Sequence, residues 1–343
     1  MTHRLATLIA TIAALTSLSA HAADGNTWKE QSRHVVGGAG GWDLLEVDAA
    51  SRRVFITRGD HLMVLDVDSG KAVGDVAGLS HAHGVALVPK LGRGYVSSGG
   101  DDRVVAFDLA TFKPIGEIAT GKNPDAMVYD AASRHVFAFN ARSNDATVID
   151  PESNKTIATV PLPGQPELAV SDARGKVFVN LEDKNQIAAI DTRTNAVAGT
   201  WSLGSCEEPT GLAIDPAHSR LFSVCANRQM AILDARSGKL VATVPIGDGP
   251  DGAAFDPASA NAFSSNSDGT LTVVHEDDAD HFHVAATVAT PARSRTITLD
   301  EKTHRVVLPF AQFDAAPAPT AEQPHPRPVM KPGSFGLVVI GKS

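Results

Sequence analysis

Residues 125–160 contain four short runs of β-prone residues separated by turn-forming residues. They read Asp125-Ala-Met-Val-Tyr-Asp130, Ala-Ala-Ser-Arg134, His135-Val-Phe-Ala-Phe-Asn140, Ala-Arg-Ser-Asn-Asp145, Ala146-Thr-Val-Ile-Asp150, Pro-Glu-Ser-Asn154 and Lys155-Thr-Ile-Ala-Thr-Val160. The runs are rich in β-branched and aromatic residues, and none has a sustained helical period. This stretch therefore predicts four consecutive antiparallel strands.

The same pattern recurs along the chain with a period of about 40 residues. A four-strand unit of this length without a helix is typical of a propeller blade. We therefore predict an all-β fold, a seven-bladed β-propeller with four-stranded antiparallel blades, as a single domain over residues 23–343. Seven repeats align on one apolar position of the second strand, occupied by Phe55, Tyr95, Phe137, Phe178, Phe222, Phe263 and Val307.

Aspartates open the turns after the first and third strands of most repeats, as in Asp130-Ala-Ala-Ser133 and Asp150-Pro-Glu-Ser153. An aspartate in this position accepts hydrogen bonds from the backbone N–H groups that follow it. Because the repeat alone accounts for them, we interpret these carboxylates as structural and not catalytic.

The N-terminal segment is expected to close the ring. The seventh repeat supplies three strands and then stops at Ser343, whereas Gln31-Ser-Arg-His-Val-Val-Gly37 matches fourth strands such as Ala158-Thr-Val-Pro-Leu162. We predict that this segment completes the last blade, because closure leaves no unpaired sheet edge.

A Pro/Ala-rich insertion at about residues 314–334 joins the second and third strands of the last repeat. Joints of this kind lie at the mouth of the propeller channel, so we expect a partial lid there. The composition equally suits a mobile surface loop.

The first 22 residues have the features of a secretory signal peptide. A basic start at Arg4 precedes an apolar run over residues 5–18, and Ala20-His21-Ala22 is a small-x-small cleavage site. We expect residues 1–22 to be removed and the mature protein to be periplasmic or secreted.

The two cysteines, Cys206 and Cys225, fall at the same end of two neighbouring strands of the fifth repeat. An oxidising compartment favours a disulfide between them. Two buried, reduced thiols are the alternative.

The charge pattern excludes some classes of partner. The formal net charge is −9 and we find no Lys/Arg cluster, so we expect no nucleic-acid partner. Nothing after residue 22 is long and apolar enough to span a membrane. We expect a monomer.

The run Val136-Phe-Ala-Phe-Asn140, with Thr147-Val-Ile-Asp150 and Lys155-Thr-Ile-Ala-Thr-Val160, resembles the YVTN β-propeller repeat of the YncE-like family. The C-terminal Arg327-Pro-Val-Met-Lys-Pro-Gly-Ser-Phe-Gly-Leu-Val-Val-Ile340 resembles the closing segment of its exported bacterial members. The resemblance implies the fold but no single function, because similar rings serve as lactonases, dehydrogenase subunits and binding proteins.

The residue that opens each first strand should face the mouth of the channel. A repeat under structural demands alone would keep one residue type at this position, whereas this chain varies it. Crowded carboxylates raise one another's pKa and attract a cation. Solvated strand-end caps are the alternative. We call these residues the mouth ring: Asp43, His83, Asp125, Glu167, Thr210, Asp251 and Arg295.

A metal ion is one candidate occupant of the mouth. His81 and His83 lie there between Asp43 and Asp125 of the neighbouring blades, and imidazole with carboxylate suits zinc or another transition metal. The two histidines have no third fixed ligand, so no cofactor is predicted and a divalent metal is the alternative. Trp42, beside Asp43, is the aromatic residue that we expect to contact a ligand.

The sequence lacks a nucleophile elbow, a phosphate-binding loop and the context of a catalytic thiol. Our leading interpretation is a binding protein that uses the channel mouth for a small polar ligand or a protein partner. A lactonase-like, metal-dependent hydrolase is the alternative, with catalytic residues that the sequence does not name. A pure protein-interaction scaffold is the third option.

Overall fold

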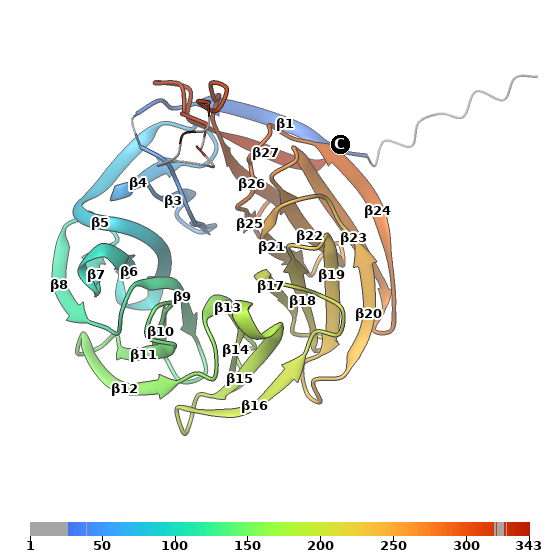
Figure 1. The fold of residues 1–343 in the computed structure, drawn as a ribbon. Helices are drawn as coiled ribbons and strands as arrows, with labels where there is room; N and C mark the ends of the chain where they lie inside the picture. The colour runs from blue at the N-terminus through green and yellow to red at the C-terminus, as the bar shows by residue number, and fades with distance from the viewer. Residues whose placement is uncertain (1–26, 39, 319, 321–325, 327) are drawn as a thin grey trace, which may run out of the picture.

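The computed structural model describes residues 27–38, 40–318, 320, 326 and 328–343. The predicted signal peptide, residues 1–22, lies outside the described residues, as does Arg327 of the insertion. Figure 1 shows the strands gathered into sheets that stand around a central space. The chain is a β-propeller, as predicted.

Five of the sheets in the described residues have four antiparallel strands each. Their strands are β1 (Trp28–Val35), β27 (Gly336–Lys342), β26 (Arg305–Phe310) and β25 (Thr298–Asp300); β9 (Pro124–Asp130), β10 (His135–Asn140), β11 (Asp145–Asp150) and β12 (Lys155–Pro161); β13 (Pro166–Ser171), β14 (Lys176–Leu181), β15 (Gln186–Asp191) and β16 (Ala196–Ser202); β17 (Pro209–Asp215), β18 (Arg220–Cys225), β19 (Gln229–Asp234) and β20 (Leu240–Pro245); and β21 (Pro250–Asp256), β22 (Asn261–Asn266), β23 (Thr270–Asp278) and β24 (His281–Ala289).

The remaining sheet has seven strands because β5 takes part in two repeats. Residues 72–77 of β5 pair with β4, and residues 82–88 pair with β6. If β5 is counted as two strands, one in each repeat, this sheet divides into two four-stranded units. The strands themselves are continuous, so the number of seven blades stays a prediction. The strands are β2 (Leu45–Asp48), β3 (Arg53–Thr57), β4 (Gly59–Asp66), β5 (Ala72–Val88), β6 (Arg93–Ser98), β7 (Arg103–Asp108) and β8 (Pro114–Ala119), and three short 3-10 turns are η1 (Pro89–Leu91), η2 (Gly99–Asp101) and η3 (Glu182–Lys184).

The core lies between neighbouring sheets. Inner strands such as β10 and β18 have almost every residue buried, because a neighbouring sheet covers each of their two faces. Phe55 of β3 packs against Phe107 of β7, with ring centroids 6.0 Å apart. The repeated aromatic position of the sequence is therefore the position that fills the space between blades.

The N-terminal strand closes the ring, as predicted. β1 pairs antiparallel with β27 from Trp28 opposite Lys342 to Val35 opposite Gly336, so it begins and ends slightly earlier than expected. Trp28 also packs edge-on against Phe263 of the neighbouring β22, with ring centroids 5.0 Å apart. The two ends of the chain thus complete one sheet.

Two of the turn aspartates, Asp130 and Asp66, show the structural role that the repeat predicted. Asp130 accepts a hydrogen bond from the Ser133 N–H at 2.8 Å, and Asp66 accepts one from the Ser69 N–H at 2.8 Å. Each carboxylate satisfies a backbone donor within its own turn.

The insertion leaves β26 and returns to β27 at the mouth end of the sheet. Phe313 and Met330 form an isolated bridge between its two arms. The ring of Phe313 lies 6.0 Å from that of Trp42 and under the guanidinium of Arg293. The described arms of the insertion therefore lie beside the channel entrance, and the partial lid stays a prediction.

Cys206 and Cys225 form the predicted disulfide, with Cα atoms 5.6 Å apart. It ties the loop before β17 to the last residue of β18, and both residues are buried. Among the described residues no helix has the length and apolar character that crossing a membrane requires.

Removal of this disulfide should lower stability without changing the fold. The double substitution Cys206→Ala and Cys225→Ala releases a loop of 19 residues, for which the chain-entropy relation gives about 3 kcal/mol. Urea denaturation followed by tryptophan fluorescence measures the difference. Reduction of the wild-type protein should reproduce the loss and leave the variant unchanged; an equal effect of reductant on both proteins would contradict the assignment.

Candidate functional site

The mouth ring lines a single cavity of about 390 Å³ at one end of the channel. All seven of its residues contribute, as the repeat register predicted. The other lining residues are Leu44, Leu168, Glu182, Gly249, Pro250 and Ser267. Below this cavity most residues that line the channel are apolar, Val85, Leu212 and Ile297 among them, but Glu46 and Glu301 also line it.

Buried polar side chains of the second strands hold the backbone of the mouth ring in place. They occupy one repeat position, two residues after the aligned aromatic residue, and each donates to a main-chain carbonyl of the next repeat. The bonds run from Thr57 Oγ1 to His83 O (2.8 Å), from Ser97 Oγ to Asp125 O (2.8 Å), from Asn180 Nδ2 to Thr210 O (2.9 Å) and from Ser265 Oγ to Arg295 O.

Glycines let the first strands approach one another just below the ring. Gly84 follows His83, and a Cβ on it would lie 2.5 Å from the carbonyl oxygen of Asp125. Gly211 follows Thr210, and a Cβ there would lie 2.7 Å from the Ala253 nitrogen. The close approach brings polar side chains from separate blades into one cavity.

Three members of the ring, which we call the mouth triad, form a group that can hold a metal ion. The ligand atoms of Asp43, His83 and Asp125 all lie within 4.8 Å of one another. His83 Nδ1 is 2.6 Å from Asp43 Oδ2 and 3.9 Å from Asp125 Oδ2. About a quarter of each side chain is exposed, toward the cavity.

The electrostatics of the mouth triad favour a positive charge between the carboxylates. Burial lowers the pKa of His83, but the hydrogen bond to Asp43 and the charges of Asp125 and Asp43 outweigh it, so the pKa is raised. Burial raises the pKa of Asp125 to about 6, and the Asp43 charge adds to this shift. Both shifts show that a positive charge beside these carboxylates is favourable, whether a protonated imidazole or a bound cation carries it.

The other carboxylates of the cavity repel one another. Burial raises the pKa of Glu167 to about 9, reinforced by the charges of Asp125, Glu182 and Asp251. Burial also raises the pKa of Asp251 to about 7, although its ion pair with Arg295 opposes the shift. Arg295 is the one arginine of the ring, so the cavity keeps an excess of acidic groups.

Two residues of the predicted site lie elsewhere. Trp42 does not line the cavity; its indole packs against Phe335 and Phe313, with centroids 5.5 and 6.0 Å away. His81 does not belong to the mouth triad. Its backbone is left-handed, with φ of 47°, and the strand register shifts between Ala82 and Val85. The simple alternation that would place His81 beside His83 is therefore broken.

Glu182 was not predicted as a site residue; it enters the cavity from η3, the joint between β14 and β15. Its pKa is raised by burial and then by Glu208. The one sequence signal for this residue is its place between a second and a third strand, because such joints lie at the channel mouth. A second group able to hold a metal ion, Asp215, His218 and Glu276, lies at the opposite end of the strands.

No family model matches this chain, and no curated protein matches its sequence. Solved structures do share its fold. A chain of Kuenenia stuttgartiensis hydrazine synthase superimposes with a TM-score of 0.69 at 17% identity, over 81% of this chain and 95% of that chain. A chain of the mitotic checkpoint complex superimposes with a TM-score of 0.71 at 14% identity, over 90% of this chain and 95% of that chain. Both are β-propellers, and the likeness concerns the fold alone.

The crowded carboxylates predict how stability depends on pH. The folded-state pKa of Glu167, about 9, lies above its unfolded value near 4.3. The stability linked to its proton is therefore fully present below about pH 4 and is lost as the pH rises toward 9.

The substitution Glu167→Gln keeps this position neutral. Its free energy of unfolding should increase relative to that of wild type by at least about 1 kcal/mol between pH 5 and pH 9, because only the wild type loses the stability linked to the Glu167 proton. Urea denaturation at both pH values measures this, with the exposed Glu152→Gln at the opposite end as the matched control. A pH-independent difference for Glu167→Gln would show that the cavity does not hold this carboxyl protonated.

Proposed function

We propose that this protein is an exported binding protein that takes a divalent transition-metal ion, and through it a small polar ligand, at the channel mouth. The observation that carries the proposal is the convergence of Asp43, His83 and Asp125 in the lining of the mouth cavity. One imidazole and two carboxylates form a donor set suited to zinc and its neighbours.

The charge of the cavity supports a cationic occupant. Five carboxyl groups face it, counting Glu182 with the four of the mouth ring, and Arg295 is engaged by Asp251. Because like charges close together raise one another's pKa, a bound cation gains the interaction that these groups lack.

The shape of the mouth favours a small ligand over a flat protein-interaction surface. The cavity volume of about 390 Å³ falls in the range of small-molecule sites. A metal ion held by three side chains keeps coordination positions for a ligand carboxylate, hydroxyl or carbonyl oxygen. The hollow shape argues against a pure scaffold.

We further propose that the protein is exported and that its repeats are of the YVTN type. The disulfide between Cys206 and Cys225 suits a periplasmic or secreted protein. One structural neighbour is a chain of an enzyme and the other is a chain of a protein complex. The fold therefore does not decide between these functions, and the proposal rests on the residues of the site.

Metal binding at the mouth should depend on His83 and not on His81. Isothermal titration of chelator-treated protein with Zn²⁺ or Mn²⁺ should reveal a site that His83→Ala and Asp43→Asn each weaken by at least about tenfold, because each removes a direct ligand. His81→Ala is the matched control, since this exposed histidine lies two residues away and outside the mouth triad. Equal effects of His81→Ala and His83→Ala would contradict the proposal.

A lactonase-like hydrolase is the second candidate. One observation favours it: Glu167, with a pKa of about 9, carries a proton at neutral pH in the same cavity as the mouth triad. A metal-bound water and a protonated carboxyl are the groups that ester hydrolysis uses. Lactone turnover by the metal-loaded protein that is lost in both Glu167→Gln and His83→Ala would establish this activity, and binding without turnover would reject it.

A further inference from the structure

We propose a second divalent-metal site, separate from the channel mouth, in which Asp215, His218 and Glu276 bind a zinc ion between the β17–β20 and β21–β24 sheets. We call these residues the far triad. Asp215 ends β17, His218 lies in the turn before β18, and Glu276 lies near the end of β23. The site is therefore at the end of the strands opposite the mouth ring.

The ligand atoms of the far triad already converge. His218 Nδ1 lies 2.8 Å from Asp215 Oδ2 and 3.0 Å from Glu276 Oε1, and all the ligand atoms lie within 4.8 Å of one another. Tetrahedral zinc separates its ligand atoms by about 3.3 Å, given metal–ligand bonds near 2.0–2.2 Å. A few tenths of an ångström of outward movement would therefore admit the ion.

Glu276 is the side chain that most needs a cation. Its side chain is 1% exposed, and apart from the ion pair with His218 neither oxygen has a polar partner among the described residues. A buried carboxylate with unmet hydrogen-bonding capacity is costly. Glu276 begins an acidic run whose other carboxylates, Asp277, Asp278 and Asp280, are exposed, so its burial is particular to this position.

The repeat shows that this carboxylate is not needed by the fold. The N–H of Glu276 donates to Ala260 O, and the same bond is made by Val67 to Arg52 O, Leu109 to Gly92 O and Ala235 to Ser219 O. The equivalent position thus holds buried apolar residues in three repeats and the buried but uncharged Thr192, whose N–H donates to Gly175 O, in a fourth. A charge at this one position indicates a local role.

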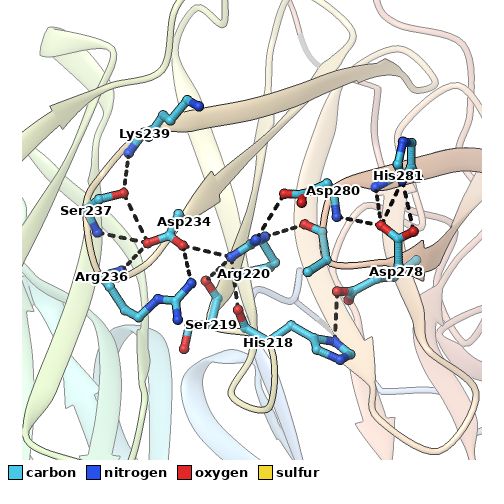
Figure 2. A network of polar contacts seen from close by, with 12 residues as sticks. His218, Ser219, Arg220, Asp234, Arg236, Ser237, Lys239, Asp278, Asp280 and His281 are labelled. Carbon is cyan, nitrogen blue, oxygen red and sulfur yellow. Dashed lines mark hydrogen bonds and ion pairs between the residues drawn. The ribbon is translucent and has the colours of Figure 1, made fainter.

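Arg220 fixes the turn that presents His218. Its guanidinium is almost buried and donates to the carbonyl of His218 at 2.9 Å and to Asp234 at 2.9 Å. It also reaches across to Asp280 of the next sheet at 3.3 Å. Figure 2 shows Arg220 between Asp234 and Asp280, with His218 beside it. Arg220 therefore links the two sheets beside the far triad, and this link does not require an ion.

The donor set and its exposure suit zinc. Asp215 keeps its carboxylate oriented by accepting hydrogen bonds from the backbone of Ala217 and His218. The His218 side chain is 52% exposed, so solvent can supply the remaining ligand. An imidazole among the donors selects a transition ion over calcium or magnesium.

A neighbouring pair provides the comparison. His304 Nδ1 lies 3.0 Å from Asp256 Oδ1, with the histidine side chain 51% exposed and the aspartate buried. That pair has the same chemistry as His218 with Asp215 but belongs to no group of three ligands in the described residues. It is an internal control for a simple histidine–aspartate ion pair.

The test is Zn²⁺ titration of the chelator-treated full chain carrying His83→Ala, which disables the mouth triad. We expect one ion per chain, with affinity lowered at least about tenfold by Glu276→Gln and by His218→Ala, whereas His304→Ala leaves it unchanged. His218→Ala changes an exposed residue, and circular dichroism verifies that each variant is folded. Zn²⁺ should also raise the melting temperature only where the far triad is intact.

Two results would overturn the proposal. One is the absence of Zn²⁺ binding in the folded His83→Ala protein. The other is binding that Glu276→Gln and His218→Ala leave intact, or that His304→Ala weakens equally. Either would mean that His218 serves Asp215 and Glu276 as a bridging imidazolium.

Discussion

Every sheet of this ring has both faces buried against its neighbours, so the ring is stable only if the first and last sheets also meet. The pairing of β1 with β27 completes the last sheet and removes the exposed edge that an open ring would leave. Val307 and Leu337 of that sheet then pack in one cluster with Val47 and Val54 of the first sheet. Closure also sets the channel, because the seven first-strand positions of the mouth ring can face one another only in a closed circle. The site therefore depends on an interaction between the two ends of the chain, far from the site itself.

The closed propeller holds acidic side chains close together at the channel mouth. Their mutual repulsion lowers stability, and the apolar packing between the sheets offsets this loss. Asp125, Glu167 and Asp251 all have raised pKa values, and the mouth triad places an imidazole between two carboxylates. Strain of this electrostatic kind is common at binding and catalytic sites. The far triad applies the same chemistry at a joint between two sheets, where Glu276 occupies a position that is uncharged in the other repeats compared.

The repeat made the fold and the composition of the mouth ring predictable, because the register of each blade carries its first-strand residue to the same height. The side-chain positions of residues next to that ring were not predictable. The left-handed backbone at His81 and the aromatic packing of Trp42 depend on local turns and on the insertion, which no periodicity encodes. Glu182 enters from a joint with its own conformation. The burial of Glu276 is hidden in the sequence by its exposed acidic neighbours, whereas the repeat register places it in a buried position.

The central claim is that the mouth triad binds a metal ion inside the acidic cavity. Anomalous diffraction at the zinc absorption edge, from crystals soaked in Zn²⁺, locates the ion directly. The account predicts a peak within coordinating distance of Asp43, His83 and Asp125, about 2.0–2.2 Å from the ligand atoms. A mouth without a peak in crystals that bind Zn²⁺ elsewhere, or a peak that contacts none of these three residues, would contradict it.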